Sequence, residues 1–343
     1  MPELVEDYLK ASKILVTGTD GDNGYIFLPL RQLVPDWEVT FNVYVKMVTK
    51  EHPDPQYTLW APRGQVIDQE RYTKLQELGI TWVYYSQEEE ERVLNYLHRN
   101  LDTLLTDENL NNEEKATLVC DVTLVWLRHF YVFEKERASA RIVLALRYLD
   151  EFFEIIKKEE ANHSFIMNIW RHSPNVYTHS LNSCLLGLAF VSYLVWPKAE
   201  AQAFGLGALL HDIGMTEVSK EIVRKPDRLE FEEWLEVKKH PIRGYRLLKD
   251  LPEVRREGLL MVVQHHENGD GSGYPCGLLM DKIHPWARIM RLLDAYEAIT
   301  APRPWRGPRT PKEALWIIRR EWEQGNIFDP FYLKAFIKYL GSF

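Results

Sequence analysis

The sequence of 343 residues predicts a mainly α-helical protein, with a C-terminal all-helical bundle and a small α/β domain at its N-terminus. Two patterns carry this prediction. Short stretches rich in β-branched and aromatic residues occur before about residue 105, whereas apolar residues recur at three- and four-residue spacing from about residue 108 onward. Histidines and aspartates also accompany the later helical segments, as they do in helical bundles that hold metals in their core.

The composition is that of an ordinary globular protein, and the chain is long enough for two domains. The formal net charge of −8 argues against a nucleic-acid polymer as partner. It does not exclude a phosphorylated substrate, because bound metals supply positive charge locally.

Three features favour a cytoplasmic protein without a membrane span. No basic segment followed by an apolar one opens the chain, so no signal peptide is expected. The apolar stretch 181–196 contains Asn182 and two serines, and it is predicted to be a buried core helix. The cysteines are too few and too scattered for a disulfide framework, as in a reducing cytosol: Cys120, Cys184 and Cys276.

Residues 1–105 are predicted to form the small α/β domain, with a regulatory role. Strands are expected at 39–48, 57–60 and 81–85. Asp68 is expected to cap a helix that Gly79 ends. The acidic run from Glu88 to Glu91 is interpreted as the solvated start of a further helix.

Residues 106–160 are predicted to form two long helices that connect the domains. Their length and amphipathicity leave two roles open, a simple connection and the interface of a homodimer. In residues 161–343, helices are expected at 178–195, 201–210, 230–239, 252–266 and 285–300, with one or two more within 311–339. The aromatics of that last segment are interpreted as core lining: Trp316, Trp322, Phe328, Phe331, Tyr332 and Phe336.

The stretch from His265 to Pro275 reads HHENGDGSGYP and follows an apolar helical run. Neutral imidazoles are the commonest metal ligands, and glycines let a loop approach a ligand closely. Counted with the histidines and aspartates of the other helical segments, seven side chains from five segments could converge in a bundle and hold two metal ions. They are His179, His211, Asp212, His240, His265, His266 and Asp294, with Asp212 as the natural carboxylate bridge. The remaining histidines, His163 among them, are interpreted as surface or packing residues.

The order of these motifs resembles the HD superfamily of metal-dependent phosphohydrolases, and the His-His pair followed by Gly273-Tyr274-Pro275 resembles its HD-GYP subfamily. The similarity covers roughly residues 161–340. It implies a cyclic di-GMP phosphodiesterase of bacterial signalling, and therefore cyclic di-GMP as partner together with signalling proteins. It also implies that the seven residues above bind the metals, usually iron or manganese. Arg303 would contact substrate phosphate, and Gly273 and Tyr274 would line the substrate pocket.

Two positions depart from the family pattern. Met215 stands where the family usually has a lysine, so a positive charge near the scissile phosphate is missing. A charge-assisted hydrogen bond is typically worth about 1.5–3 kcal/mol, which corresponds to roughly ten- to hundredfold in rate. Asn175 stands where three-metal members have a glutamate, so two metals are expected.

The expected chemistry is attack of a metal-bridging hydroxide on phosphorus, giving the linear dinucleotide, GMP or both. Imidazole and carboxylate ligands suit iron, manganese or zinc. Glu267 and Asp270 are candidates for orienting the imidazoles. Two alternatives stay open: a cyclic di-GMP-binding signalling module weakened by Met215, and a hydrolase of another cyclic dinucleotide.

Overall fold

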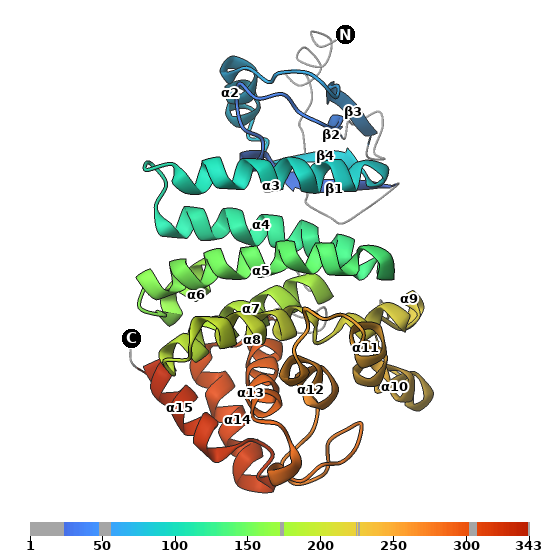
Figure 1. Ribbon diagram of the computed structural model, residues 1–343, viewed down its shortest axis with the longest axis vertical. Helices are drawn as coiled ribbons and strands as arrows, with labels where there is room; N and C mark the ends of the chain where they lie inside the picture. The colour runs from blue at the N-terminus through green and yellow to red at the C-terminus, as the bar shows by residue number, and fades with distance from the viewer. Residues whose placement is uncertain are drawn as a thin grey trace. The chain divides into compact units, whose positions relative to one another are not determined.

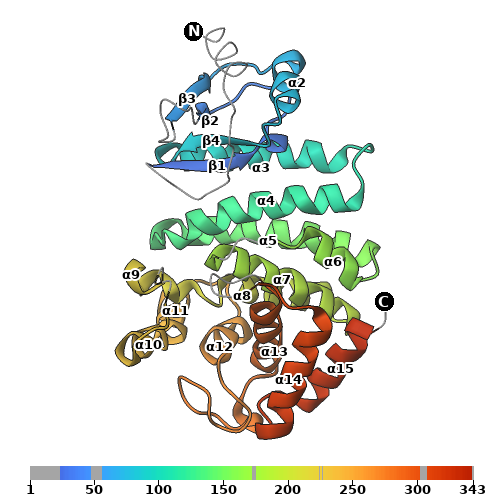
Figure 2. The ribbon, with the colours of Figure 1, turned by 180° about the vertical axis from the view of Figure 1, so that it is seen from behind.

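The computed structural model describes residues 24–47, 56–171, 175–223, 225, 227–301 and 307–341. Contacts divide the chain into two compact units, one up to Asn111 and the other from Asn112. Figures 1 and 2 show the elements of both units from opposite sides. Most of the described residues are helical, and strands occur in the first unit, so the predicted fold class is confirmed.

The N-terminal unit contains one antiparallel sheet in the order β1-β4-β2-β3. Its strands are β1 (Tyr25–Pro29), β2 (Val43–Met47), β3 (Gln56–Ala61) and β4 (Trp82–Ser86). The prediction missed β1, whose five residues pair with β4 from Tyr25 opposite Ser86 to Pro29 opposite Trp82. The predicted strand 39–48 begins later, because Val39 bonds to the turn at Gln65 instead of entering the ladder.

The helices of this unit are α2 (Gln69–Glu77) and α3 (Glu90–Thr106), with 3₁₀ turns η1 (Leu30–Gln32) and η2 (Gln87–Glu89). Asp68 caps α2 by accepting a hydrogen bond from the Arg71 backbone, and Gly79 follows the helix at φ 73°, so both predicted signals are confirmed. The acidic run does start a helix, but the interpretation as fully solvated was wrong. Glu89 and Glu90 are buried, since they face the core side of η2 and α3.

The C-terminal unit is all-helical. Its helices are α4 (Asn112–Tyr131), α5 (Lys135–Lys158), α6 (His163–Ile169), α7 (Val176–Tyr193), α8 (Lys198–Leu210), α9 (Lys220–Val223), α10 (Phe231–Val237), α11 (His240–Leu248), α12 (Arg256–Gln264), α13 (Pro285–Thr300), α14 (Pro311–Gly325) and α15 (Pro330–Gly341), with 3₁₀ turns η3 (Ile213–Glu217) and η4 (Met280–Lys282). The predicted 285–300 helix is confirmed. The predicted 252–266 helix is shorter, because both histidines after Gln264 leave it.

Helix α7 is the centre of the unit and packs on α5, α8 and α13. Its residues from Ser180 to Val191 are all buried, as expected for a helix that is apolar on every side. The predicted buried core helix is therefore confirmed, and none of the described helices is long and apolar enough to cross a membrane. Figures 1 and 2 show α12 and α13 between α9–α11 on one side and α14–α15 on the other.

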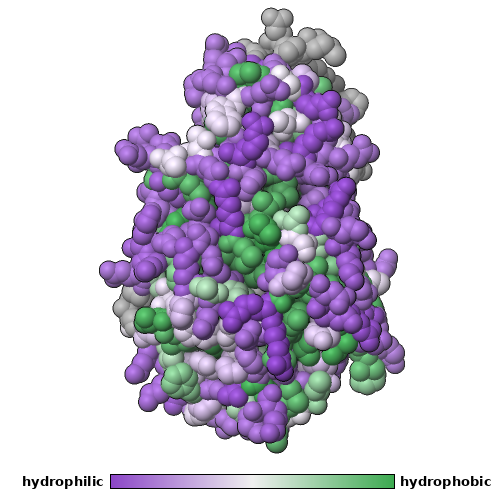
Figure 3. Space-filling view, viewed as in Figure 1, coloured by the Kyte–Doolittle hydropathy of each residue, from purple (hydrophilic) through white to green (hydrophobic). Residues whose placement is uncertain are grey.

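Part of the aromatic prediction at the C-terminus was wrong. Phe328 and Phe336 are buried, but Trp316 and Phe331 are 62% and 69% exposed. These two lie on the outward faces of α14 and α15, whose inner faces supply the core residues. On the side seen in Figure 3, hydrophilic residues dominate, and hydrophobic side chains form scattered patches.

Candidate metal centre

The histidines and aspartates singled out from the sequence stand mostly at helix ends. His211 directly follows α8, Asp212 precedes η3, and His240 opens α11. His265 and His266 follow α12 at the point where the chain leaves the helix. Helix ends direct short segments into the bundle core, and this allows side chains distant in sequence to meet there.

The seven residues form two adjacent clusters whose ligand atoms lie within 4.8 Å of one another in each cluster. The first cluster consists of His179, His211 and Asp294, and the second of Asp212, His240, His265 and His266. His211 and His265 are fully buried, and Asp294 is 8% exposed. Each cluster contains imidazoles and one carboxylate, a combination that suits divalent transition metals.

Asp212 joins the two clusters through its two carboxylate oxygens. Oδ2 faces the first cluster, 3.5 Å from Nε2 of His211 and 3.7 Å from Nε2 of His179. Oδ1 faces the second, 3.2 Å from Nε2 of His240 and 3.6 Å from Nε2 of His265. One carboxylate is thus shared between two groups of nitrogens, as the sequence analysis expected of a bridging ligand.

Asp294 closes the first cluster and reaches toward the second. Its Oδ1 lies 3.1 Å from Nε2 of His179. Its Oδ2 lies 3.8 Å from Nδ1 of His266. Helix α13 therefore supplies a carboxylate that lies near an imidazole of each cluster.

Backbone carbonyls fix three of the imidazoles in one tautomer. Nδ1 of His211, His240 and His265 lies 2.7–2.8 Å from the carbonyl oxygen three residues earlier in the chain. A carbonyl oxygen only accepts, so Nδ1 carries the proton and Nε2 keeps its lone pair. Anchoring the far nitrogen in this way orients a metal-binding imidazole.

The anchored nitrogens approach each other closely. Nε2 of His240 and Nε2 of His265 are 3.2 Å apart, and both carry lone pairs. The Nε2 atoms of His179 and His211 are also 3.2 Å apart. The facing lone pairs of His240 and His265 repel, and a cation bound there would turn this repulsion into coordination. The donor set thus fits a metal on the geometry of the side chains alone.

His179 is anchored by a carboxylate that the sequence analysis missed. Its Nδ1 donates to Oε2 of Glu297 at 2.6 Å, and Asn182 donates to the other oxygen of Glu297 at 3.2 Å. Glu297 is 1% exposed. The available signal was its spacing, since Glu297 stands three residues after Asp294 and shares its face of α13.

Gly214 brings Asp212 close to His240. An added Cβ at Gly214 would lie 2.0 Å from the carbonyl oxygen of His240 and 2.6 Å from the backbone nitrogen of Gly244. Only glycine lets η3 and α11 approach so closely. The short segment after the His-Asp pair is therefore part of the geometry of the second cluster.

The charges of the site suit metal binding. Burial alone would raise the pKa of Asp212, but the surrounding imidazoles, His211 first, hold this pKa well below its usual value. Asp294 behaves in the same way, since its contact with His179 lowers its pKa against the effect of burial. Burial lowers the pKa of His211 to about 4. Both carboxylates are therefore ionised and His211 is neutral near pH 7, as metal coordination requires.

Glu267 holds the loop that follows His266. The sequence analysis considered Glu267 as a residue that orients the imidazoles, but its carboxylate bonds to the backbone of the loop instead. Glu267 is 1% exposed and accepts from the backbone nitrogens of Cys276 and Leu278 at 2.7 and 2.8 Å. Asp270 accepts from Ser272 within the loop. An added Cβ at Gly273 would lie 2.2 Å from the backbone nitrogen of Asn268, so this position requires glycine.

Tyr274 lies directly beside the second cluster. Its ring stacks on His266, with centroids 4.7 Å apart and planes at 28°. Trp234 of α10 meets it edge-on at 6.0 Å, and Nζ of Lys238 lies 5.4 Å from its centroid. Trp234 is 41% exposed, so an aromatic and cationic wall borders the metal centre.

Three further residues that the sequence analysis named do not belong to the two clusters. Met215 lies in η3, three residues after Asp212, and its backbone nitrogen bonds to the Asp212 carbonyl. Asn175 is the N-cap of α7, and its side chain accepts from the Thr178 backbone at 2.9 Å. Arg303 lies outside the described residues.

Residues 172–331 match the HD domain family. The cyclic di-GMP phosphodiesterase PA4108 of Pseudomonas aeruginosa is 38% identical over 167 residues, which are 49% of this chain and 40% of that protein. The cyclic di-GMP phosphodiesterase response regulator RpfG of Xanthomonas campestris is 33% identical over 142 residues, or 41% of this chain and 37% of that protein. The matched part thus spans less than half the length of these relatives.

Phosphodiesterases named for a different cyclic dinucleotide, 3'3'-cGAMP, also match. The 3'3'-cGAMP-specific phosphodiesterase 3 of Vibrio cholerae is 38% identical over 111 residues, covering 32% of this chain and 24% of that protein. Among solved structures, Bd1817, an HDG"Y"P protein from Bdellovibrio bacteriovorus, superposes with a TM-score of 0.66 at 20% identity. That likeness covers 93% of this chain and 99% of the other, so the fold is shared across both units.

The buried imidazoles and carboxylates could hold metal, and they lie in a helical domain, residues 172–331, that matches the HD domain family. The relatives named as cyclic di-GMP phosphodiesterases support the HD-GYP subfamily that the order of the motifs predicted.

Proposed function

We propose that the protein is a metal-dependent phosphodiesterase that hydrolyses cyclic di-GMP to the linear dinucleotide, GMP or both. The observation that carries this proposal is Asp212, whose two oxygens face two separate groups of imidazole nitrogens. Two-metal sites of this kind are used for displacement at phosphorus. The relatives PA4108 and RpfG are cyclic di-GMP phosphodiesterases by name, and this supports the substrate class.

Two divalent transition metals, iron or manganese, are proposed as the cofactors. His179, His211 and Asp294 would hold one, His240, His265 and His266 the other, and Asp212 both. Bound metals of this kind lower the pKa of water and stabilise negative charge on phosphate oxygens. Asn175 supports two metals and not three, because its side-chain oxygen already caps α7.

The residues bordering the centre would bind and orient the dinucleotide. Tyr274 and Trp234 offer aromatic faces for a guanine base, and Lys238 between them offers a charge for a phosphate. Gly273 keeps Tyr274 in place because its backbone contacts leave no room for a side chain. Arg303 remains proposed as a forked phosphate contact, since a guanidinium offers two parallel donors.

The test is an assay of the purified chain reconstituted with iron or manganese, with cyclic di-GMP as substrate and chromatographic detection of products. Hydrolysis that depends on added metal supports the proposal. Full metal loading without hydrolysis of any cyclic dinucleotide contradicts it.

A second candidate substrate is 3'3'-cGAMP, because several matching relatives carry that specificity in their names. A competition assay with equal concentrations of both dinucleotides separates the candidates through the ratio of kcat/KM. The first candidate predicts faster loss of cyclic di-GMP.

Met215 favours a third candidate, a module that binds cyclic di-GMP with little turnover. Met215→Lys adds a cation three residues after Asp212, and we expect a roughly ten- to hundredfold gain in kcat. A wild type that binds cyclic di-GMP tightly without forming product would support the third candidate. An unchanged kcat in Met215→Lys would show that the missing positive charge at this position does not limit hydrolysis.

The N-terminal unit is proposed to be regulatory, acting with signalling partner proteins. Helices α4 and α5 are proposed as the interface of a homodimer, on the basis of their length. Their apolar faces pack on α7 and α8 within the same chain, so a second chain would contact their exposed sides. Light scattering during gel filtration measures the mass. A single-chain mass of 40.4 kDa at all concentrations would contradict dimerisation.

A further inference from the structure

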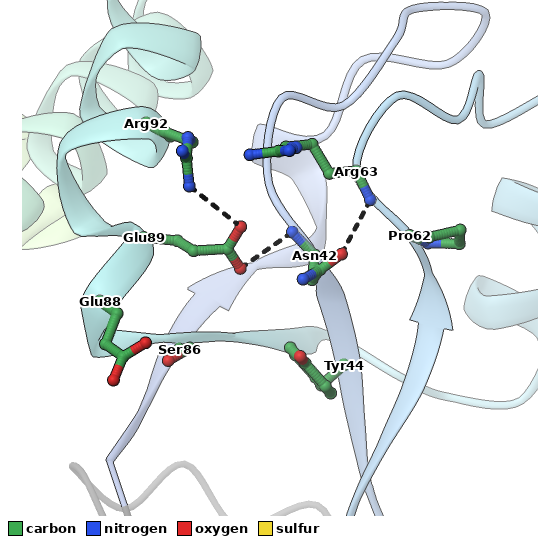
Figure 4. Close-up of a pocket in the computed structure, with 8 residues that line it drawn as sticks. All are labelled: Asn42, Tyr44, Pro62, Arg63, Ser86, Glu88, Glu89 and Arg92. Atoms are coloured by element: carbon green, nitrogen blue, oxygen red, sulfur yellow. Dashed lines mark hydrogen bonds and ion pairs between the residues drawn. The ribbon is translucent and has the colours of Figure 1, made fainter.

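A polar cleft of about 560 Å³ lies in the N-terminal unit, where the ends of β2 and β3 meet the start of α3 (Figure 4). Its volume falls in the range of roughly 300–1,000 Å³ that is typical of small-molecule sites. The residues that line it are mostly polar or charged: Asn42, Tyr44, Pro62, Arg63, Ser86, Glu88, Glu89 and Arg92.

An irregularity in the sheet forms one wall of the cleft. The register of β2 against β3 shifts between Val43 and Tyr44, so the ladder breaks next to Asn42. The backbone nitrogen of Asn42 donates to Oε2 of Glu89 at 3.1 Å, and its side-chain oxygen accepts from the Arg63 backbone at 2.9 Å. Such breaks often occur beside binding sites, where they redirect side chains.

The charged groups of the cleft are incompletely paired. The Glu89 side chain is only 10% exposed, and its Oε1 lies 3.8 Å from Nη1 of Arg92, which is too long for a hydrogen bond. Arg63 forms no ion pair through its guanidinium among the residues that the structure describes. Within the described part of the chain, Oε1 of Glu89 thus accepts no hydrogen bond, and neither guanidinium group donates one to a side chain.

Figure 4 shows how these groups face one another. Arg92 reaches from α3 toward Glu89, with which it forms the ion pair drawn as a dashed line, and Arg63 extends toward Arg92 from the turn after β3. The carboxylate of Glu88 turns away from both arginines. Glu89 offsets the charge of one guanidinium group, and an anion bound between the arginines would offset the other.

We propose that this cleft binds a small phosphorylated ligand of about mononucleotide size, with its phosphate between Arg63 and Arg92 and a hydrogen-bond donor on Glu89. Guanidinium groups match phosphate oxygens with two parallel donors each. The free oxygen of Glu89 accepts an N–H or O–H from the same ligand, so recognition needs both an anion and a donor. This inference is independent of the reaction proposed for the metal centre.

The test uses GMP, which combines a phosphate with adjacent N–H donors on its base. Full-length protein, stripped of metal by a chelator, is titrated calorimetrically at low salt. GMP is expected to bind with one site in the cleft, and Arg63→Gln and Arg92→Gln are each expected to weaken its binding about tenfold. Arg99→Gln, an exposed position on the same helix α3, is the matched control and leaves binding unchanged.

Two further experiments test separately the contribution of the phosphate and that of the hydrogen-bond donor. Guanosine, which lacks the phosphate, is expected to bind at least about tenfold more weakly than GMP. Glu89→Gln is expected to weaken GMP binding while leaving binding of inorganic phosphate unchanged. Absence of GMP binding, or equal affinity in the wild type and both arginine variants, overturns the proposal. Guanosine binding as tightly as GMP also overturns it.

Discussion

The metal centre and the N-terminal cleft differ in how firmly their functional groups are held. In the centre, His211, His240 and His265 are buried and each has a second contact that fixes its ring. In the cleft, the Arg92 side chain is 52% exposed and held by one loose ion pair. A metal needs several ligands at fixed positions, whereas a phosphate can be bound by side chains that adjust to it. The first site thus depends on rigid geometry and the second on charge.

The largest effect is expected from Asp212→Ala, which removes the carboxylate shared by both clusters. Metal content should fall for both positions, and hydrolysis should fall by roughly a thousandfold or more, because the second cluster would keep imidazoles alone and the first would keep only the carboxylate of Asp294. Elemental analysis and the cyclic di-GMP assay measure these effects. Binding of GMP in the N-terminal cleft should not change, which distinguishes the two regions.

Asp281→Ala is the matched control for that variant, because this carboxylate is 68% exposed and pairs with Lys282. It should retain metal and activity. An Asp212→Ala protein with full metal loading would show that the shared carboxylate is not a ligand.

Glu297→Gln should produce the next largest effect, because it removes the negative charge that anchors His179. Loss of such an anchor typically costs 10- to 100-fold in metal affinity or activity. Metal affinity is measured by competition with a chromophoric chelator, and the tautomer of His179 by nitrogen NMR. Glu323→Gln, at a half-exposed position on α14, is the control. Unchanged affinity together with an unchanged His179 tautomer would exclude a positioning role for Glu297.

Acid should destabilise the C-terminal unit through His163. Burial lowers the pKa of His163 from 6.5 to about 4, and its Nε2 lies 3.2 Å from the hydroxyl of Tyr296. The unfolded chain takes up this proton first, so stability falls as pH decreases from about 6.5 to about 4 and is unaffected by this residue at higher pH. The loss is on the order of 3 kcal/mol, at about 1.4 kcal/mol per unit of pKa.

His163→Gln retains a polar group that cannot become charged in this range. Thermal unfolding followed by circular dichroism between pH 7 and pH 4 should show a shallower decline in Tm for this variant. Parallel declines in both proteins would contradict the assignment to His163.

Salt should give the smallest effect, and it sharpens the contrast between the two regions. The screening length is about 10 Å at 0.1 M salt and about 3 Å at 1 M, so exposed guanidinium groups lose attraction for phosphate as salt rises. We expect GMP binding in the cleft to weaken severalfold between 0.05 and 0.5 M NaCl. Metal content at the buried centre, measured in the same samples, should remain constant. Equal sensitivity of both would contradict the distinction.

The metal centre could be predicted from sequence because histidines and aspartates are informative at helix ends. His265 and His266 end an apolar run, and this doublet alone is only a modest sign of a metal site. The prediction became specific when the doublet was counted with the histidines and aspartates of the other helical segments. Residues that orient a candidate metal ligand, instead of binding the metal themselves, are harder to find in the sequence. Glu297 is a common residue type on an ordinary helix, and only the packing of α13 on α7 reveals its contact with His179.

The N-terminal unit was less predictable for a related reason. Strand β1 is five residues long and pairs with β4, some 57 residues later in the chain, so local pattern indicates it poorly. Glu89 was interpreted as solvated because acidic runs usually are, but pairing with the Asn42 backbone allows its burial. Arginines and glutamates are frequent on surfaces, and their convergence depends on the sheet that carries them.

The position of Asp212 between the clusters has a thermodynamic consequence. Because one carboxylate faces both sides, a cation held by the first group of nitrogens would withdraw electron density from the carboxylate that the second group uses, and it would also fix the orientation of that carboxylate. Occupancy of the two positions would therefore be coupled, and by reciprocity each cation would alter the affinity for the other by the same factor. Stepwise loading, followed one equivalent at a time, would reveal the sign of that coupling.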